Sequence, residues 1–90
     1  MGLFAITIRD GVPATEITAI LVERGYSVSF ERETSGGFFF SVPGKRRPLE
    51  FWITSALPHR FCVGVGPKGQ QLVTLLADRG VFTEPQSSAG

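Results

Sequence analysis

The chain has 90 residues, of which 42% are hydrophobic and eight are Phe, with nine Lys or Arg against eight Asp or Glu. This length suffices for one domain, and a net charge of +1 lacks the positive excess by which most nucleic-acid-binding proteins neutralise phosphates. A single Cys excludes an internal disulfide, and no apolar run reaches the roughly 18 residues of a membrane span. We expect a soluble, cytoplasmic protein without a signal peptide.

The first third of the chain predicts a strand, a helix and a second strand. Residues 3–9 alternate large apolar side chains with smaller or polar ones, as in a half-buried strand. Pro13 suits the first turn of a helix, and apolar residues then recur at helical spacing until Gly25, a typical helix stop. Residues 26–31 alternate again, so we expect the second strand there.

The next segment predicts a β-hairpin that ends with a third strand over residues 38–42. Two registers fit this hairpin. A two-residue turn would place Glu31 opposite Val42 on a mixed face, whereas a three-residue loop at residues 35–37 would place Phe30 opposite Val42. We favour the second register, because a slip of one residue would turn the apolar face toward solvent.

The second half of the chain predicts two more strands and a second helix. Residues 49–54 and 61–65 show strand alternation, and residues 81–83 suggest a short edge strand. Between them, Pro67 opens a helix and Gly80 stops it.

The expected fold is α+β, a ferredoxin-like split βαβ sandwich with two helices on one face of a four- to five-stranded, mostly antiparallel sheet. Residues 17–25 resemble residues 72–80, and each stretch follows a strand and a proline. We favour convergence of two glycine-capped amphipathic helices over duplication. The domain is expected to span residues 1–85, with residues 86–90 as a flexible tail.

A family resemblance rests on one strand, a turn, a helix end and the start of a second strand: Phe4-Ala5-Ile6-Thr7-Ile8-Arg9, Asp10-Gly11-Val12-Pro13, Glu23-Arg24-Gly25 and Tyr26-Ser27-Val28. Residues 3–32 thereby resemble the first half of an ACT domain, a small regulatory module that often senses amino acids. The resemblance implies a ferredoxin-like fold and a ligand site near the first turn. That turn has the order Gly-Val-Pro where the family has Pro-Gly, so we expect no ligand there.

Catalysis and metal binding find little support in the sequence. His59 is the only His and Cys62 the only Cys. A catalytic Cys–His pair needs contact and an orienting third group, and a metal site needs several clustered ligands. We therefore predict no enzymatic activity, no metal and no cofactor.

Residues 64–69, Gly-Val-Gly-Pro-Lys-Gly, match the G-x-G-x-x-G pattern of dinucleotide-binding turns between a predicted strand and helix. The second strand that should carry a ribose-binding acid does not follow. A plain turn and helix start is the favoured interpretation. The alternative is a weak anion-binding site at Gly66, Lys68 and Gly69.

The loop at residues 43–48 carries the only run of charge, Lys45, Arg46 and Arg47. Three basic side chains at a hairpin tip could contact phosphates or an acidic protein surface. A solvated loop without a partner is the alternative.

Two aromatic residues interrupt the polar face of the predicted sheet. If Phe40 faces Phe51 across the third and fourth strands, then Phe39 faces Trp52 on the opposite face. The polar residues expected to share that face are Ser29, Glu31, Glu33, Ser41, Glu50 and Thr54. Phe39 and Trp52 are then candidate interface anchors, or else a cross-strand pair that only stabilises the sheet by roughly 0.2–1 kcal/mol.

The favoured function is a non-enzymatic protein-binding domain, an inhibitor or regulatory subunit that acts by surface occlusion. The many Phe residues favour a protein partner or self-association as a homodimer. An ACT-like sensor of amino acids is the second hypothesis and a weak nucleic-acid-binding module the third, disfavoured because the glutamates on the polar face repel phosphate. We expect no membrane partner.

Overall fold

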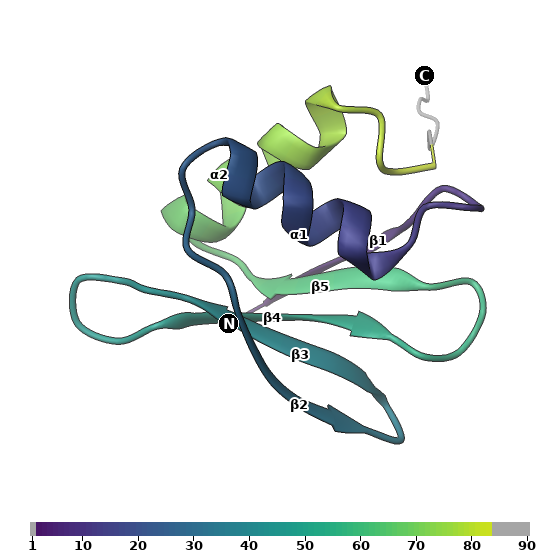
Figure 1. The fold of residues 1–90 in the computed structure, drawn as a ribbon, viewed down its shortest axis with the longest axis horizontal. Helices are drawn as coiled ribbons and strands as arrows, with labels where there is room; N and C mark the ends of the chain where they lie inside the picture. The colour runs from purple at the N-terminus through teal and green to yellow at the C-terminus, as the bar shows by residue number, and fades with distance from the viewer. Residues whose placement is uncertain (1, 84–90) are drawn as a thin grey trace.

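A computed structural model describes residues 2–83, which form an α+β fold of one five-stranded antiparallel sheet and two helices (Figure 1). The expected tail at residues 86–90 lies outside the described residues. The elements, in chain order, are β1 (Leu3–Thr7), α1 (Ala14–Glu23), β2 (Ser29–Thr34), β3 (Gly37–Val42), β4 (Leu49–Thr54), β5 (Arg60–Gly64) and α2 (Pro67–Asp78).

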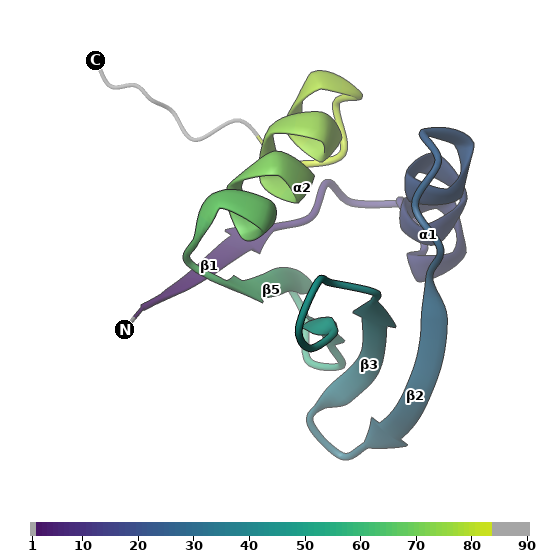
Figure 2. The same ribbon diagram turned by 90° about the vertical axis from the view of Figure 1, so that its left-hand side faces the viewer.

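The strand order is β1-β5-β4-β3-β2, and every neighbouring pair is antiparallel. β2 to β5 form a meander, and β1 joins the free side of β5. β1 and β2 are therefore the two edges, and α1 crosses the sheet between them. Both helices cover the same face, α2 over the β1–β5 side and α1 over the β2–β3 side (Figure 2). This order is compatible with a ferredoxin-like arrangement but does not confirm one. Neither helix in residues 2–83 has the length and apolar character of a membrane span.

The register of the β2–β3 hairpin differs from the predicted one. Thr34 pairs with Gly37 around a two-residue turn, and Phe30 pairs with Phe40 instead of Val42. A bulge in the middle of β2 shifts the register there, since a bulge places two residues opposite one. Because of the bulge, Phe30 lies beside Phe40, with ring centroids 5.6 Å apart, and the hairpin turn has two residues instead of the predicted three.

The second strand also begins later than predicted, because the end of α1 uses the residues before it. Gly25 has a φ of 95°, its N–H donates to the carbonyl of Val22, and the Tyr26 N–H donates to the carbonyl of Leu21. These two bonds form a Schellman motif. Tyr26 thus completes the helix cap, and pairing with β3 starts only at Ser29.

The second helix ends in the same way. Gly80 has a φ of 74°, its N–H donates to the carbonyl of Ala77, and the Val81 N–H donates to that of Leu76. The likeness of the two helical stretches in the sequence therefore reflects one shared capping geometry.

The core lies between the helices and the sheet. A line of four Phe rings crosses it, with neighbouring centroids 5.2, 5.1 and 5.8 Å apart: Phe40, Phe51, Phe61 and Phe82. All four are buried, and Phe51 and Phe61 are completely inaccessible. Phe82 reaches this line from the predicted edge strand at residues 81–83, which forms one bridge to Ile8. Four of the eight Phe residues therefore form this buried line, and Phe4 and Phe38 pack against the core as partly buried residues.

Candidate protein-binding face

The face of the sheet opposite the helices has no element of residues 2–83 packed over it (Figure 2). We call it the open face. One residue from each of the five strands lies in register across its middle: Arg32, Phe39, Trp52, Cys62 and Ala5. We call these five residues the central row. Because side chains alternate along a strand, the neighbours of each on its own strand belong to the helix-covered face.

Phe39 and Trp52 form a stacked pair in the central row, as the sequence predicted. They are directly opposite in the β3–β4 register, their ring centroids lie 5.5 Å apart, and the planes meet at 21°. The Arg32 guanidinium lies 4.3 Å from the centroid of the Phe39 ring, which is cation–π distance. Both aromatic side chains are half-buried by their neighbours. The three planar groups thus present one ordered, accessible surface.

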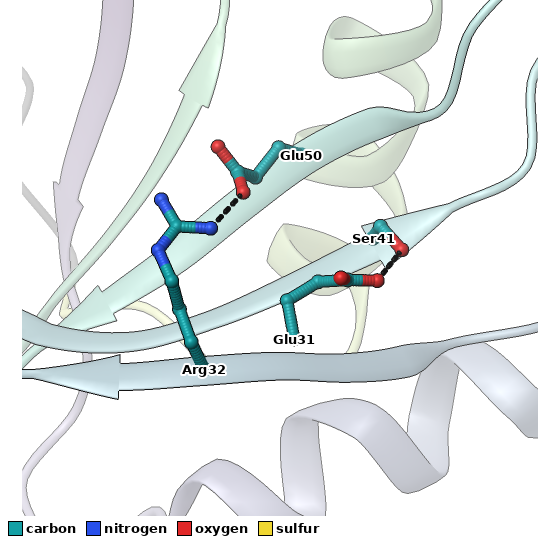
Figure 3. A network of polar contacts seen from close by, with 4 residues as sticks. All are labelled: Glu31, Arg32, Ser41 and Glu50. Carbon is teal, nitrogen blue, oxygen red and sulfur yellow. Dashed lines mark hydrogen bonds and ion pairs between the residues drawn. The ribbon is translucent and has the colours of Figure 1, made fainter.

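Polar contacts beside the central row hold Arg32 in place. Arg32 extends from β2 across β3, and its Nη1 donates to Glu50 Oε2 on β4 at 2.9 Å (Figure 3). Ser41 Oγ on β3 donates to Glu31 Oε2 on β2 at 2.6 Å. Glu31 and Glu50 therefore lie on the open face as predicted. The prediction for Glu33 is wrong, because the bulge places it opposite Phe38 on the other face.

Cys62 lies in the central row directly opposite Trp52 and is only 5% exposed. Burial raises the pKa of its thiol, and the positive charge of Arg60 opposes that shift in part. The neutral thiol is therefore favoured at this position, whereas a catalytic or metal-binding cysteine acts as the thiolate. Cys62 is therefore a buried neighbour beside Trp52 on the adjacent strand.

His59 uses its ring to fix the loop before β5. Its Nδ1 lies 2.8 Å from the backbone carbonyl oxygen of Thr54, and since a carbonyl only accepts, Nδ1 carries the proton. Among residues 2–83, no group of three or more His, Cys, Asp or Glu side chains is placed to hold a metal ion.

The basic loop, Lys45, Arg46 and Arg47, joins β3 to β4 and extends from one end of the sheet (Figure 1). All three residues are exposed, and none forms an ion pair with another described residue. A Cβ on Gly44 would overlap the carbonyl oxygen of Arg47. The glycine therefore lets the chain close tightly and present the basic side chains together.

The glycines at the start of α2 have different roles. A Cβ on Gly69 would overlap the carbonyl oxygen of Gly64, whereas one on Gly66 would meet open space. Gly69 is buried and lets the first turn of α2 lie on the end of β5. Packing thus accounts for Gly69. Of the three residues of the candidate anion-binding site, only Gly66 and the half-buried Lys68 remain accessible to an anion.

A pocket of about 350 Å³ lies at the turn before α1, where the ACT-like resemblance implied a ligand site and the Gly-Val-Pro order argued against one. Its walls come from three separate parts of the chain: the turn and helix start at residues 10–14, Phe38 on β3, and the end of β4 with the loop after it, at Ile53, Thr54, Leu57 and His59. Leu57 is 79% exposed at its rim. The turn that resembles an ACT domain therefore borders a mostly apolar pocket.

Comparison with known proteins adds no relative: no family model, curated protein or solved structure matches this chain. The open face, the basic loop and the pocket must therefore be judged by their own geometry. Of these, sequence reasoning named Phe39, Trp52 and the loop. It missed Arg32, whose place in the central row depends on the bulge.

Proposed function

We propose that this chain is a small, non-enzymatic protein-binding domain that acts as an inhibitor or regulatory subunit by covering a surface of its partner. The observation that carries the proposal is the stacked pair of Phe39 and Trp52, partly exposed on a sheet face that no described element covers. A reducing compartment such as the cytoplasm suits this chain, because its single Cys, Cys62, is a free thiol.

Interface chemistry supports a protein partner. Aromatic residues and Arg are enriched at the centres of protein interfaces and supply most hot spots. Here Arg32 is held over Phe39 by its ion pair with Glu50, so little rotamer freedom is left to lose on binding. Glu31 and Glu50 beside the pair disfavour phosphate, which ranks a nucleic acid below a protein.

The test uses the intact chain as bait in an extract of its native host. Wild type and the double variant Phe39→Ala/Trp52→Ala are compared, with Phe30→Ala as the matched control, because Phe30 is exposed but pairs on the other face. We expect a partner that wild type and Phe30→Ala retain and the double variant loses. A true hot spot weakens binding by about 2 kcal/mol or more, roughly 30-fold in Kd.

Circular dichroism must show that the double variant is folded. A partner that binds all three proteins equally would place the interface elsewhere and overturn the proposal. Sedimentation could instead show a homodimer that the double variant does not form. The open face would then still be the interface, but its partner would be a second copy of the chain.

A small-molecule sensor is the second candidate, favoured by the pocket beside Gly11 and by a ferredoxin-like, ACT-like relationship. The pocket volume of about 350 Å³ lies within the range of ligand sites. A ligand at about 100 times its Kd adds roughly 2.7 kcal/mol, several degrees in Tm for a domain of this size. A thermal-shift series with the amino acids tests this candidate. If no amino acid raises the Tm, the sensor hypothesis is overturned.

A further inference from the structure

Charge is unevenly distributed between the two sides of the molecule. The open face and the basic loop together carry five basic residues: Arg32, Lys45, Arg46, Arg47 and Arg60. Among residues 2–83, only two acidic residues, Glu31 and Glu50, lie there, so the described residues of this side have a net charge of +3. The other described residues carry four basic and five acidic side chains, a net charge of −1. Glu50 is already paired with Arg32, so the loop charges dominate the field at one end of the face.

The open face alone is too small for a standard interface. Five strands at about 4.8 Å spacing and roughly 18 Å of strand length cover about 350 Å² in plan, whereas a stable complex buries about 800 Å² on each partner. The interface must therefore extend beyond the sheet. The basic loop is in line with β3 and β4, and Trp52 is three residues from Leu49 at the loop, about 10 Å away.

A second copy of the chain fits this surface poorly. Two sheets that pack face to face keep their strands roughly aligned, and the two-fold axis of a dimer then lies in the plane between them. One orientation places the basic loop against its own copy. The other places it against the end of the face that carries Arg60, where the described residues of the same row are Thr7, Thr54, Gly37 and Thr34. The first orientation brings the six basic side chains of the two loops together, and the nearby Glu31 and Glu50 offset only part of that charge, because Glu50 is already paired with Arg32. The second opposes the basic loop to Arg60, and the row that faces the loop contains no acidic residue among residues 2–83.

We infer that the partner of the open face is an acidic protein segment or surface, whose apolar side chains cover Phe39 and Trp52 while its carboxylates reach Lys45, Arg46 and Arg47. This inference rests on the proposed function and adds the chemistry of the partner to it. Charge complementarity of this kind accelerates encounter and excludes partners of the wrong sign.

Trp52 is the only Trp of the chain, so its fluorescence reports directly on the occupancy of the open face. The probes are a short peptide of Glu and Leu, its counterpart with Gln in place of Glu, and a single-stranded DNA oligonucleotide. We expect the Glu–Leu peptide to shift the Trp52 emission and to bind at least tenfold more tightly than the Gln–Leu peptide at low salt, with the difference shrinking as salt rises.

Charge reversal locates the contact. The triple variant Lys45→Glu/Arg46→Glu/Arg47→Glu should bind the Glu–Leu peptide about tenfold more weakly or worse. The matched control, Arg9→Glu/Arg24→Glu/Arg79→Glu, changes the net charge equally but at positions away from the open face, and it should retain binding. Circular dichroism confirms that both variants are folded.

The remaining outcomes decide against the inference in distinguishable ways. Equal binding of the Glu–Leu and Gln–Leu peptides, both with a shifted Trp52 emission, overturns the acidic partner and leaves the proposed function standing. Tighter binding of DNA with a shifted emission makes the partner a nucleic acid. The Glu–Leu peptide could also bind without a change in the Trp52 emission and with the same affinity for Trp52→Ala. That result would exclude the open face as the binding site and would overturn the proposed function as well.

Discussion

The two faces of the sheet use the same device for different purposes. On the helix-covered face Phe40 stacks on Phe51, with centroids 5.2 Å apart. One residue along each strand, Phe39 stacks on Trp52 at 5.5 Å. Phe51 is completely buried, whereas Trp52 keeps part of its ring accessible. The geometry of the two pairs is nearly equal, so it is the cover above each pair that separates core from site.

This difference shows which aromatic residues are candidates for binding. A stacked pair under two helices contributes to the free energy of folding, and its replacement is felt throughout the core. A stacked pair without cover contributes a cross-strand contact of modest size and leaves apolar area for a partner. The two faces should therefore respond oppositely to equivalent substitutions.

The largest expected effect is on the covered face. Phe51→Ala removes a ring in contact with those of Phe40 and Phe61 and should lower the free energy of unfolding by about 3–5 kcal/mol. A domain of this size has a small stability margin, so the variant should be largely unfolded at room temperature. Urea denaturation followed by circular dichroism measures this. A loss below about 1 kcal/mol would mean that the covered face is not the core.

The cover itself depends on a glycine. Gly69→Ala would force a Cβ against the carbonyl oxygen of Gly64 and push the start of α2 away from β5, at a cost of about 1–3 kcal/mol. Gly66→Ala is the matched control, because a Cβ there meets open space. Thermal denaturation should show a lower Tm for the first variant alone. Helix propensity alone would favour Ala over Gly at position 69, so an unchanged or higher Tm of Gly69→Ala would contradict the close contact with Gly64.

On the open face, Trp52→Ala should cost far less stability than Phe51→Ala. It removes the stack with Phe39, worth about 0.5–1.5 kcal/mol beyond the apolar area that the ring buries. Because part of the Trp52 ring is already accessible, we expect a folded protein whose free energy of unfolding falls by less than in Phe51→Ala. If Trp52→Ala instead unfolds the domain in urea titrations, Trp52 belongs to the core and the contrast between the faces fails.

The sequence predicted those features that depend on neighbouring residues. Pro67 and Gly80 marked the ends of α2, and Gly25 marked the end of α1. The opposition of Phe39 and Trp52 followed from strand alternation, because β3 and β4 pair without a bulge. Local chemistry and period were sufficient in each case.

Features that depend on packing between distant segments were missed. The bulge in β2 exists only in relation to β3, so strand alternation alone could not predict that Arg32 would lie on Phe39 or that Glu33 would leave the open face. The pairing of β1 with β5 joins segments more than fifty residues apart. The pocket at Gly11 likewise needs Phe38 and Leu57 to come together. Such arrangements follow from tertiary structure, which overrides local preference.

The buried thiol of Cys62, which lies beside Trp52 on the adjacent strand, gives a pH-dependent test of the packing at this position. Burial raises its pKa, so the folded state favours the neutral thiol. The associated stability is fully present below the ordinary pKa of a thiol and is lost as the pH rises through the raised pKa. We expect wild type to lose stability relative to Cys62→Ala only at alkaline pH, in urea titrations over a pH series. A constant difference between the two proteins would contradict this.

The smallest expected effects concern the ion pair on the open face. Arg32 and Glu50 are about half exposed, so Glu50→Gln should change the free energy of unfolding by less than about 0.5 kcal/mol. The exposed pair of Arg79 and Glu23 on the helix side supplies the matched control, Glu23→Gln. The two substitutions change stability and net charge alike, but only Glu50→Gln removes a carboxylate from beside the aromatic pair.

Binding of the Glu–Leu peptide, followed by Trp52 fluorescence, should therefore strengthen about twofold in Glu50→Gln and stay unchanged in Glu23→Gln. Equal changes in both would mean that net charge alone governs the binding, and weaker binding in Glu50→Gln would mean that the orientation of Arg32 matters more than its free charge.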